Sequence, residues 1–293
     1  MSPAPPSGSL ARLSPLVRRL IAPNKGPFTF TGTCSYIVGE GRVAIIDPGP
    51  MDEAHIVALI EAVGCETIDA IVITHTHRDH SPGARLLQKA TGAPIIGCAP
   101  HALIDDDPSR RPDTSHDLEH RPDQVLRDGE IYTGDGFRLQ ALETPGHASN
   151  HLAFALLEEN ALFSGDHVMG WSTSVIAPPD GNMRDYLRSL ERLMARQDSV
   201  YWPGHGDIVE DPQRLVRGYI VHRQQRENAI LARLADGDRT IAQIVQAIYP
   251  GLDERLHKAA SLSALAHLED LVERGLVMSD AGAATLDAVY TLK

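Results

Sequence analysis

The sequence predicts an α/β fold followed by a small helical segment near the C-terminus. Short apolar runs of strand length alternate with amphipathic runs of helix length from about residue 29 to residue 202. Beyond residue 211, three helical patterns precede a short pair of strands, an order that matches a winged-helix topology. We therefore divide the chain into a tail over 1–20, a catalytic domain over 21–210, and a helical linker with a winged helix over 211–293.

The N-terminal stretch is expected to be a disordered or frayed tail. Prolines such as Pro3 and Pro15 would break a helix, and no acidic residue occurs before Glu40. A transit peptide shares this basic bias but needs an amphipathic helix, and no apolar core of a secretory signal is present. We expect a cytoplasmic protein, with the mitochondrial matrix as the alternative.

Strands and helices alternate in the first half of the catalytic domain. Ile56, Leu59 and Val63 recur at helical spacing, and Ser81 with Pro82 is typical of a helix start. The elements expected here are a hairpin over 29–38 and 43–47, a helix over 52–64, a strand ending at 73, a helix over 82–90 and a strand over 94–98.

A long polar excursion over residues 101–123 interrupts this alternation. It is rich in aspartate, arginine and proline, and a loop of this length is often a lid or a binding loop. His101, His116 and His120 lie in or beside it, and we expect them to be solvated.

The remaining elements follow in a regular order. Strands are expected over 137–142, 151–157, 161–164 and 199–202, with a helix over 183–196. The C-terminal segment should hold a long helix from 212, helices over 240–248 and 256–274, and strands over 276–278 and 288–292.

A histidine-rich motif follows the apolar run Ile71–Ile73, where a buried strand should end. Residues 74–80 are Thr-His-Thr-His-Arg-Asp-His. Side chains two apart on a strand point the same way, so His75 and His77 should leave on one face. Asp79 and His80 come as the chain turns, and can be aimed at a neighbouring point. The motif therefore predicts two adjacent metal half-sites, with ligands suited to zinc and, as second choices, manganese or iron.

Further histidines and aspartates follow later strand ends, each beside a glycine: His147, Asp166 and His205. Together with the motif they make five histidines and two aspartates, enough for two ions with one bridging carboxylate. Two such ions can hold a hydroxide between them as a nucleophile. The sequence has no Gly-x-Ser-x-Gly elbow, dinucleotide fingerprint or P-loop.

Four segments in this order resemble the successive motifs of the metallo-β-lactamase superfamily. They are Thr74–His80, Thr144-Pro145-Gly146-His147, Ser164-Gly165-Asp166 and Pro203-Gly204-His205-Gly206. The resemblance covers about residues 20–210 and implies a four-layer αββα sandwich. It also implies that His75, His77 and His147 bind a first metal, that Asp79, His80 and His205 bind a second, and that Asp166 bridges them. Asp79 would in addition orient the bridging hydroxide as a catalytic residue.

Segments around Asp166–Gly170, Pro178–Gly181 and Ala266–Leu271 resemble the lactamase-beta-2-like branch, which has a C-terminal winged-helix domain. That branch includes a single-strand endoribonuclease. We therefore expect a dinuclear-metal hydrolase, zinc being the first choice, that acts as a phosphodiesterase or endoribonuclease. The alternative is a thioester or lactone hydrolase similar to glyoxalase II. Substrate contacts are expected from His151, Trp171, Ser172 and Thr173.

A third possibility is that the winged helix binds nucleic acid or a partner. The net charge of −12 disfavours general attraction to nucleic acid, and residues 211–293 are near neutral. We expect a small molecule or single-stranded RNA as substrate, no membrane partner, and a homodimer as an option. The three widely spaced cysteines, Cys34, Cys65 and Cys98, are expected to be free thiols.

Overall fold

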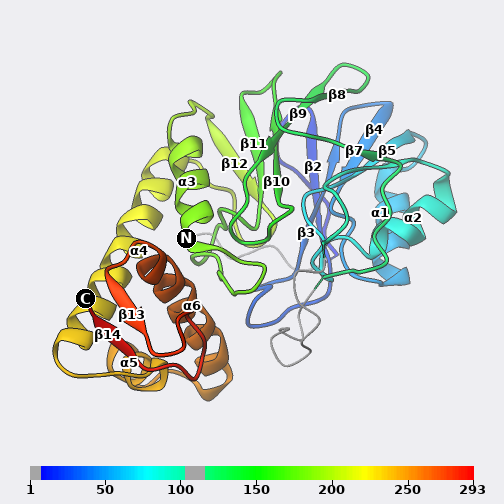
Figure 1. Ribbon diagram of the computed structural model, residues 1–293. Helices are drawn as coiled ribbons and strands as arrows, with labels where there is room; N and C mark the ends of the chain where they lie inside the picture. The colour runs from blue at the N-terminus through cyan, green and yellow to red at the C-terminus, as the bar shows by residue number, and fades with distance from the viewer. Residues whose placement is uncertain (1–7, 103–115) are drawn as a thin grey trace.

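The apolar runs of the first half of the chain form a seven-stranded sheet in the order β1 to β7 (Figure 1). The computed structural model describes residues 8–102 and 116–293. The strands from β4 to β7 run parallel, and those from β1 to β4 antiparallel. Their bounds are Ala11–Arg12, Val17–Ile21, Cys34–Val38, Arg42–Ile46, Thr67–Ile73, Ile95–Gly97 and Gln124–Val125.

A second sheet of five strands, in the order β12-β11-β10-β9-β8, faces the first (Figure 1). The inner faces of the two sheets share one core, in which Ile37 and Ile71 lie with Phe154, Phe163 and Trp202. Alternation along the strands places these large side chains inward. The bounds of β8 to β12 are Ile131–Thr133, Arg138–Glu143, Leu152–Leu156, Ala161–Gly165 and Val200–Pro203.

Helices cover the outer faces of both sheets and complete a four-layer αββα sandwich, as predicted. Helices α1 (Glu53–Val63) and α2 (Gly83–Thr91) lie against the first sheet, and α3 (Met183–Met194) lies against the second (Figure 1). Tyr186 and Leu190 of α3 pack in a core with Ala155 and Leu162, the small and apolar residues on the outer face of the second sheet.

The C-terminal segment, residues 211–293, forms the predicted winged helix around a third core. Helix α4 (Pro212–Ala235) runs from the sandwich into α5 (Ile241–Ile248) and α6 (Glu254–Glu273), and a hairpin of β13 (Val277–Ser279) and β14 (Tyr290–Leu292) follows (Figure 1). Its core is made by apolar residues of all three helices and the hairpin, among them Ile230, Ile244, Leu268, Val277 and Tyr290. Within the described part of the chain, no helix has the length and apolar character needed to cross a membrane.

Several local expectations were wrong. Residues 1–7 lie outside the described part, but residues 11–12 and 17–20 of the expected tail are strand, because β1 pairs with β2 and β2 pairs with β3. The first-hairpin strand begins at Cys34 and not at Thr29, and the short strand β8 was missed. Helix α2 begins one residue later than expected, at Gly83, and Ser81 makes no cap hydrogen bond. Ser81 instead donates to Asp117 at the return of the long excursion.

Candidate metal centre

The seven predicted ligands lie at one edge of the sandwich, where strands of both sheets end. The motif 74–80 follows β5 of the first sheet. His147, Asp166 and His205 follow β9, β11 and β12 of the second sheet. Two sheets that pack face to face bring these strand ends together, so ligands up to 130 positions apart in sequence meet across the sandwich.

The first ligand set consists of three imidazoles, those of His75, His77 and His147. Nδ1 of His77 lies 3.0 Å from Nε2 of His75 and 3.0 Å from Nε2 of His147. His75 is fully buried, and the side chain of His147 is 10% exposed. Three ring nitrogens therefore converge on one point, which is the donor arrangement of a metal site with protein ligands on one side and an open position on the other.

The second set consists of Asp79, His80, Asp166 and His205. Nε2 of His205 lies 3.0 Å from Asp79 Oδ2, 3.2 Å from Nε2 of His80 and 3.3 Å from Asp166 Oδ2. The same Asp166 oxygen is 3.7 Å from Nε2 of His147 in the first set. Asp166 thus stands between the two sets, where a bridging carboxylate is needed.

The outer nitrogens of the ligand rings are fixed by hydrogen bonds to the protein. Nδ1 of His147 donates to the carbonyl of Val175 at 2.7 Å, and Nδ1 of His205 donates to the carbonyl of Gly32 at 3.3 Å. Nδ1 of His75 contacts the Thr74 hydroxyl at 2.9 Å, and that hydroxyl in turn donates to a carboxylate. In these three rings the bonds place the proton on Nδ1 and leave Nε2, the inward nitrogen, free to bind a cation.

Asp47 supports the ligands from behind and was not predicted from the sequence. It is 2% exposed and follows β4, the neighbour of β5. Its carboxylate accepts from the backbone N–H of Thr74 at 2.9 Å, from the Thr74 hydroxyl at 2.6 Å and from Nδ1 of His80 at 2.9 Å. The sequence did hold a signal, because Asp47 ends a strand just as the ligands do and is followed by Pro48-Gly49.

The pKa values of the buried histidines shift in opposite directions in the two ligand sets. Burial, assisted by neighbouring histidines, holds the pKa of His75 well below its ordinary value. Burial would also lower the pKa of His80, but the carboxylates of Asp166 and Asp79 outweigh it and raise that pKa well above the ordinary value. The same carboxylates raise the pKa of His205 to about 9 against the effect of burial. The second set therefore attracts positive charge into a buried site.

The residues present fit a pair of metal ions. In the described part of the chain, Oδ1 of Asp166 is buried without a hydrogen-bond partner. Buried carboxylate oxygens are almost always hydrogen-bonded or bound to a cation, and the inward ring nitrogens share the same space. Nitrogen and oxygen donors of this kind suit zinc, manganese or iron.

The expected substrate residues divide into two groups. His151 is 1% exposed, with Nδ1 bonded to Thr144 Oγ1 at 2.8 Å and Nε2 accepting from the N–H of Asp166 at 3.1 Å. Both of its ring nitrogens are thus bonded within the protein, and the expected substrate contact of His151 stays a prediction. Trp171 is 37% exposed and stacks on Phe30, with ring centroids 5.0 Å apart. Ser172 is exposed and Thr173 half-buried beside it, so these three stay candidates for the rim of the site.

The excursion histidines were expected to be solvated, and this was also wrong. His116 is 6% exposed and His120 only 1%. The rings of His101 and His116 stack 3.6 Å apart, and Nε2 of His116 lies 3.0 Å from Asp180 Oδ2. The ring of His116 is also 4.7 Å from that of the ligand His77. Residues 103–115 of the excursion lie outside the described residues.

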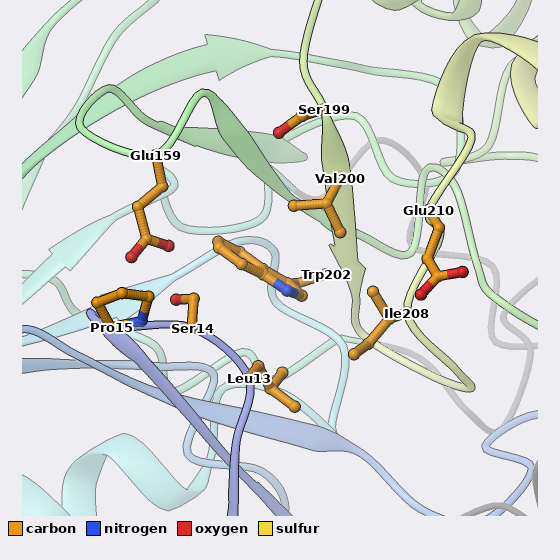
Figure 2. A pocket seen from close by; sticks show the side chains of 9 residues that line it. All are labelled: Leu13, Ser14, Pro15, Glu159, Ser199, Val200, Trp202, Ile208 and Glu210. Carbon is orange, nitrogen blue, oxygen red and sulfur yellow. The ribbon is translucent and has the colours of Figure 1, made fainter.

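A cavity of about 580 Å³ opens at the other end of the second sheet (Figure 2). Ser199 directly precedes β12, Val200 begins it, and Glu159 lies in the β10–β11 turn, whereas the ligands follow the opposite ends of these strands. Figure 2 shows the Glu159 and Glu210 side chains on either side of the Trp202 indole. None of the seven ligands lines this cavity, so the metal centre is a separate place.

Two family models match the chain. Residues 28–205 match the metallo-beta-lactamase superfamily, and residues 240–284 match the beta-lactamase associated winged helix domain. The first match spans every ligand described above, from His75 to His205.

Similar proteins cover most of the chain. The beta-lactamase-like protein 2 homolog of Drosophila melanogaster is 30% identical over 275 residues, which are 91% of this chain and 91% of that protein. The atrochrysone carboxyl ACP thioesterase of Aspergillus fumigatus is 28% identical and covers 81% of this chain and 74% of its own. The crystal structure of a metallo-beta-lactamase family protein from Thermus thermophilus superposes with a TM-score of 0.77 at 26% identity, covering 96% of this chain and 100% of that one.

Proposed function

The chain belongs to the metallo-beta-lactamase superfamily, and we propose that it is a hydrolase whose two ligand sets each hold one divalent metal ion. The convergence of inward ring nitrogens and of the two carboxylates supports this proposal. His75, His77 and His147 would hold one ion, and Asp79, His80 and His205 the other. Asp166 would contact both, because one of its oxygens lies near rings of both sets.

The metal ions would acidify water and polarise the carbonyl or phosphoryl group of a substrate. The protein contributes orientation and proton acceptance. Asp79 is the most exposed member of the second set, with 28% of its side chain accessible, whereas the Asp166 side chain is 8% exposed. The Asp79 carboxylate can therefore orient a water toward an incoming substrate and accept its proton.

We propose zinc as the resident metal, with manganese or iron as alternatives. Five imidazoles and two carboxylates, with no thiolate among them, suit all three ions. Two observations decide between the three metals: which one copurifies with the protein, and which one restores activity after chelation.

We propose an acyl thioester as the substrate. Water would add to the acyl carbon and the C–S bond would break, which releases a carboxylic acid and a thiol. The similarity to a thioesterase over 81% of this chain supports this choice. The net charge of −12 also disfavours a polyanionic substrate. This reverses the order suggested by the sequence, in which a phosphodiester came first and a thioester or lactone second.

A phosphodiester in single-stranded RNA is the second candidate, and one observation favours it. Trp171 is exposed and stacks on Phe30, with ring centroids 5.0 Å apart. The pair lies next to the proposed ligand His205, because a side chain at the following residue, Gly206, would touch the Trp171 ring. An exposed stacked aromatic pair beside a catalytic centre can hold an unpaired base.

One activity screen tests both candidates. Metal-loaded protein would be assayed on acyl thioesters, lactones, phosphodiesters and single-stranded RNA, with the Asp79→Ala variant as control. Thioester hydrolysis that is lost in Asp79→Ala supports the first candidate. RNA cleavage that is lost in both Asp79→Ala and Trp171→Ala, with thioesters unreacted, would select the second. Full activity in Asp79→Ala would contradict the metal-centre assignment.

A further inference from the structure

One loop forms hydrogen bonds both with the proposed metal ligand His147 and with the C-terminal segment. This metal loop, residues 166–177, begins at the bridging candidate Asp166 and carries Val175, whose carbonyl accepts the Nδ1 proton of His147 at 2.7 Å. Ser174 braces the loop, because its hydroxyl reaches the carbonyls of Asp166 and His167. The position of the Val175 carbonyl therefore sets the orientation of the His147 ring.

Helix α4 of the C-terminal segment holds the same loop from its other side. Arg223 donates from Nη2 to the carbonyl of Ser174, which belongs to the peptide group directly before Val175. Four residues earlier, the Tyr219 hydroxyl lies 2.7 Å from the carbonyl of Met169 and 2.5 Å from that of Ser172. Two side chains on one face of α4 thus fix three carbonyls of the metal loop.

The environment of Arg223 is unusual for a cation. It is 4% exposed, and no carboxylate of the described residues lies within ion-pair distance of it. Its guanidinium lies 5.2 Å from the centroid of the Tyr186 ring, and its Nε is buried without a hydrogen-bond partner in the described part of the chain. A buried guanidinium without a counter-ion is a poor source of stability, so its bond to the Ser174 carbonyl needs another explanation.

We propose that Arg223 is a positioning residue for the metal centre, and that the C-terminal segment completes this centre through it. Arg223 bonds to the Ser174 carbonyl, and the next carbonyl along the backbone, that of Val175, accepts the Nδ1 proton of His147. The inference rests on the proposed function, because it takes His147 as a metal ligand. It gives the winged helix a role that needs no nucleic acid: docking of α4 and metal binding stabilise each other.

The direction of the effect follows from linkage. A ring that is held with Nε2 aimed at the ion binds that ion more tightly than a ring that must first be ordered, and partners of this kind commonly contribute about 10- to 100-fold in metal affinity. Because coupling between two equilibria is reciprocal, metal loading must also strengthen the docking of α4 against the metal loop.

The test is cobalt binding to the full-length protein. Cobalt(II) would be titrated against a competing chelator, and its visible absorption would report the coordination of each ion. We expect wild-type protein to bind two ions, and Arg223→Met to bind one of them about 10- to 100-fold more weakly, with altered absorption. Arg223→Lys, which keeps the charge but not the reach of the guanidinium, should lie between the two. Tyr219→Phe should weaken the same ion by a smaller factor.

Arg226→Met is the matched control. Arg226 lies on the same helix, but its guanidinium packs over the Tyr249 ring at 4.8 Å and its Nε donates to His222 at 3.3 Å. It should bind both ions as wild type does. Folded Arg223→Met with wild-type affinity for both ions would overturn the proposal. If Arg223→Met fails to fold, wild-type affinities in both Arg223→Lys and Tyr219→Phe would overturn it. Wild-type protein that binds no cobalt would overturn the proposed function as well.

Discussion

Nδ1 of His80 donates to the buried carboxylate of Asp47 at 2.9 Å, so a residue that follows β4 fixes the ring of a metal-ligand candidate that follows β5. We predict that Asp47→Asn weakens binding of one metal ion by about 10- to 100-fold. An amide has one oxygen where Asp47 uses both, and asparagine tolerates the positive φ of 48° at this position. Chelator competition measures the affinity. Asp69→Asn, which breaks a surface ion pair with Arg42, is the control, and equal losses in both variants would refute the role of Asp47.

Gly204 leaves no room for a side chain beside the second ligand set. A Cβ there would lie 2.3 Å from Asp166 Oδ1 and 2.8 Å from Cε1 of His80. Its backbone is bonded to Gly165 and Cys34, so it cannot retreat. We predict that Gly204→Ala displaces the Asp166 carboxylate and reduces bound metal to well below two ions per chain, as measured by elemental analysis. Gly218→Ala, which meets open space on α4, should keep both ions.

Metal removal should destabilise the protein. Asp79 and Asp166 place two carboxylates in one buried set, and a cation offsets their repulsion. A ligand present at about a thousand times its dissociation constant stabilises by about 4 kcal/mol. For a chain of this length, that corresponds to a fall in melting temperature of about 10 °C on chelation. Differential scanning fluorimetry before chelation, after it and after zinc is returned measures this change, and an unchanged melting temperature would argue against resident metal.

Asp180 organises the far side of the first ligand set. Its carboxylate accepts from the N–H of Ser149 at 3.1 Å and lies 3.0 Å from Nε2 of His116. We predict that Asp180→Asn lowers the free energy of unfolding by about 1–3 kcal/mol, because the buried ring of His116 loses its hydrogen-bond acceptor. The metal content should stay at two ions, since Asp180 is not among the seven ligands. Urea unfolding and elemental analysis check both statements. Asp236→Asn, at a 65% exposed side chain, should change neither quantity.

His267 should make the fold sensitive to acid. Burial, followed by the nearby basic groups of Arg223, His222, Arg274 and Arg226, lowers its pKa to about 3. Between the unfolded pKa near 6.5 and this value, only the unfolded chain takes up the proton, so stability falls as the pH drops below about 6.5. At pH 4.5 this single group costs about 3 kcal/mol.

His267→Gln removes that proton uptake. Urea unfolding of chelated protein at pH 7 and pH 4.5 should therefore show a loss of stability about 3 kcal/mol smaller in His267→Gln than in wild type. The exposed His257 gives the control, since His257→Gln should keep the wild-type pH dependence. Identical pH dependence in all three proteins would refute the assignment.

The fold class, the winged helix and the seven residues that meet at the candidate metal centre could be predicted from sequence alone. Each of these features depends on residues that are close together in the sequence. Each ligand directly follows a strand, the strands show as apolar runs, and the helices show as periodic patterns whose burial the structure confirms. Errors arose where local composition pointed away from a tertiary partner. Residues 11–20 resemble a tail because they are rich in arginine and proline-flanked. Val17–Ile21 nevertheless pairs with Cys34–Val38, and Ala11–Arg12 pairs with Val17–Ile21 in turn.

The contacts that hold the ligand side chains in place could not be predicted in this way. Asp47 and His80 are 33 positions apart, and Ser174 and Arg223 are 49 apart. His116 and Asp180 are likewise joined only by folding. Periodicity and motif spacing report which side chains are buried and which leave a strand end. They carry no information on which ring nitrogen faces inward or which carbonyl lies behind it, because those depend on contacts between segments that the folded sheets and helix α4 bring together.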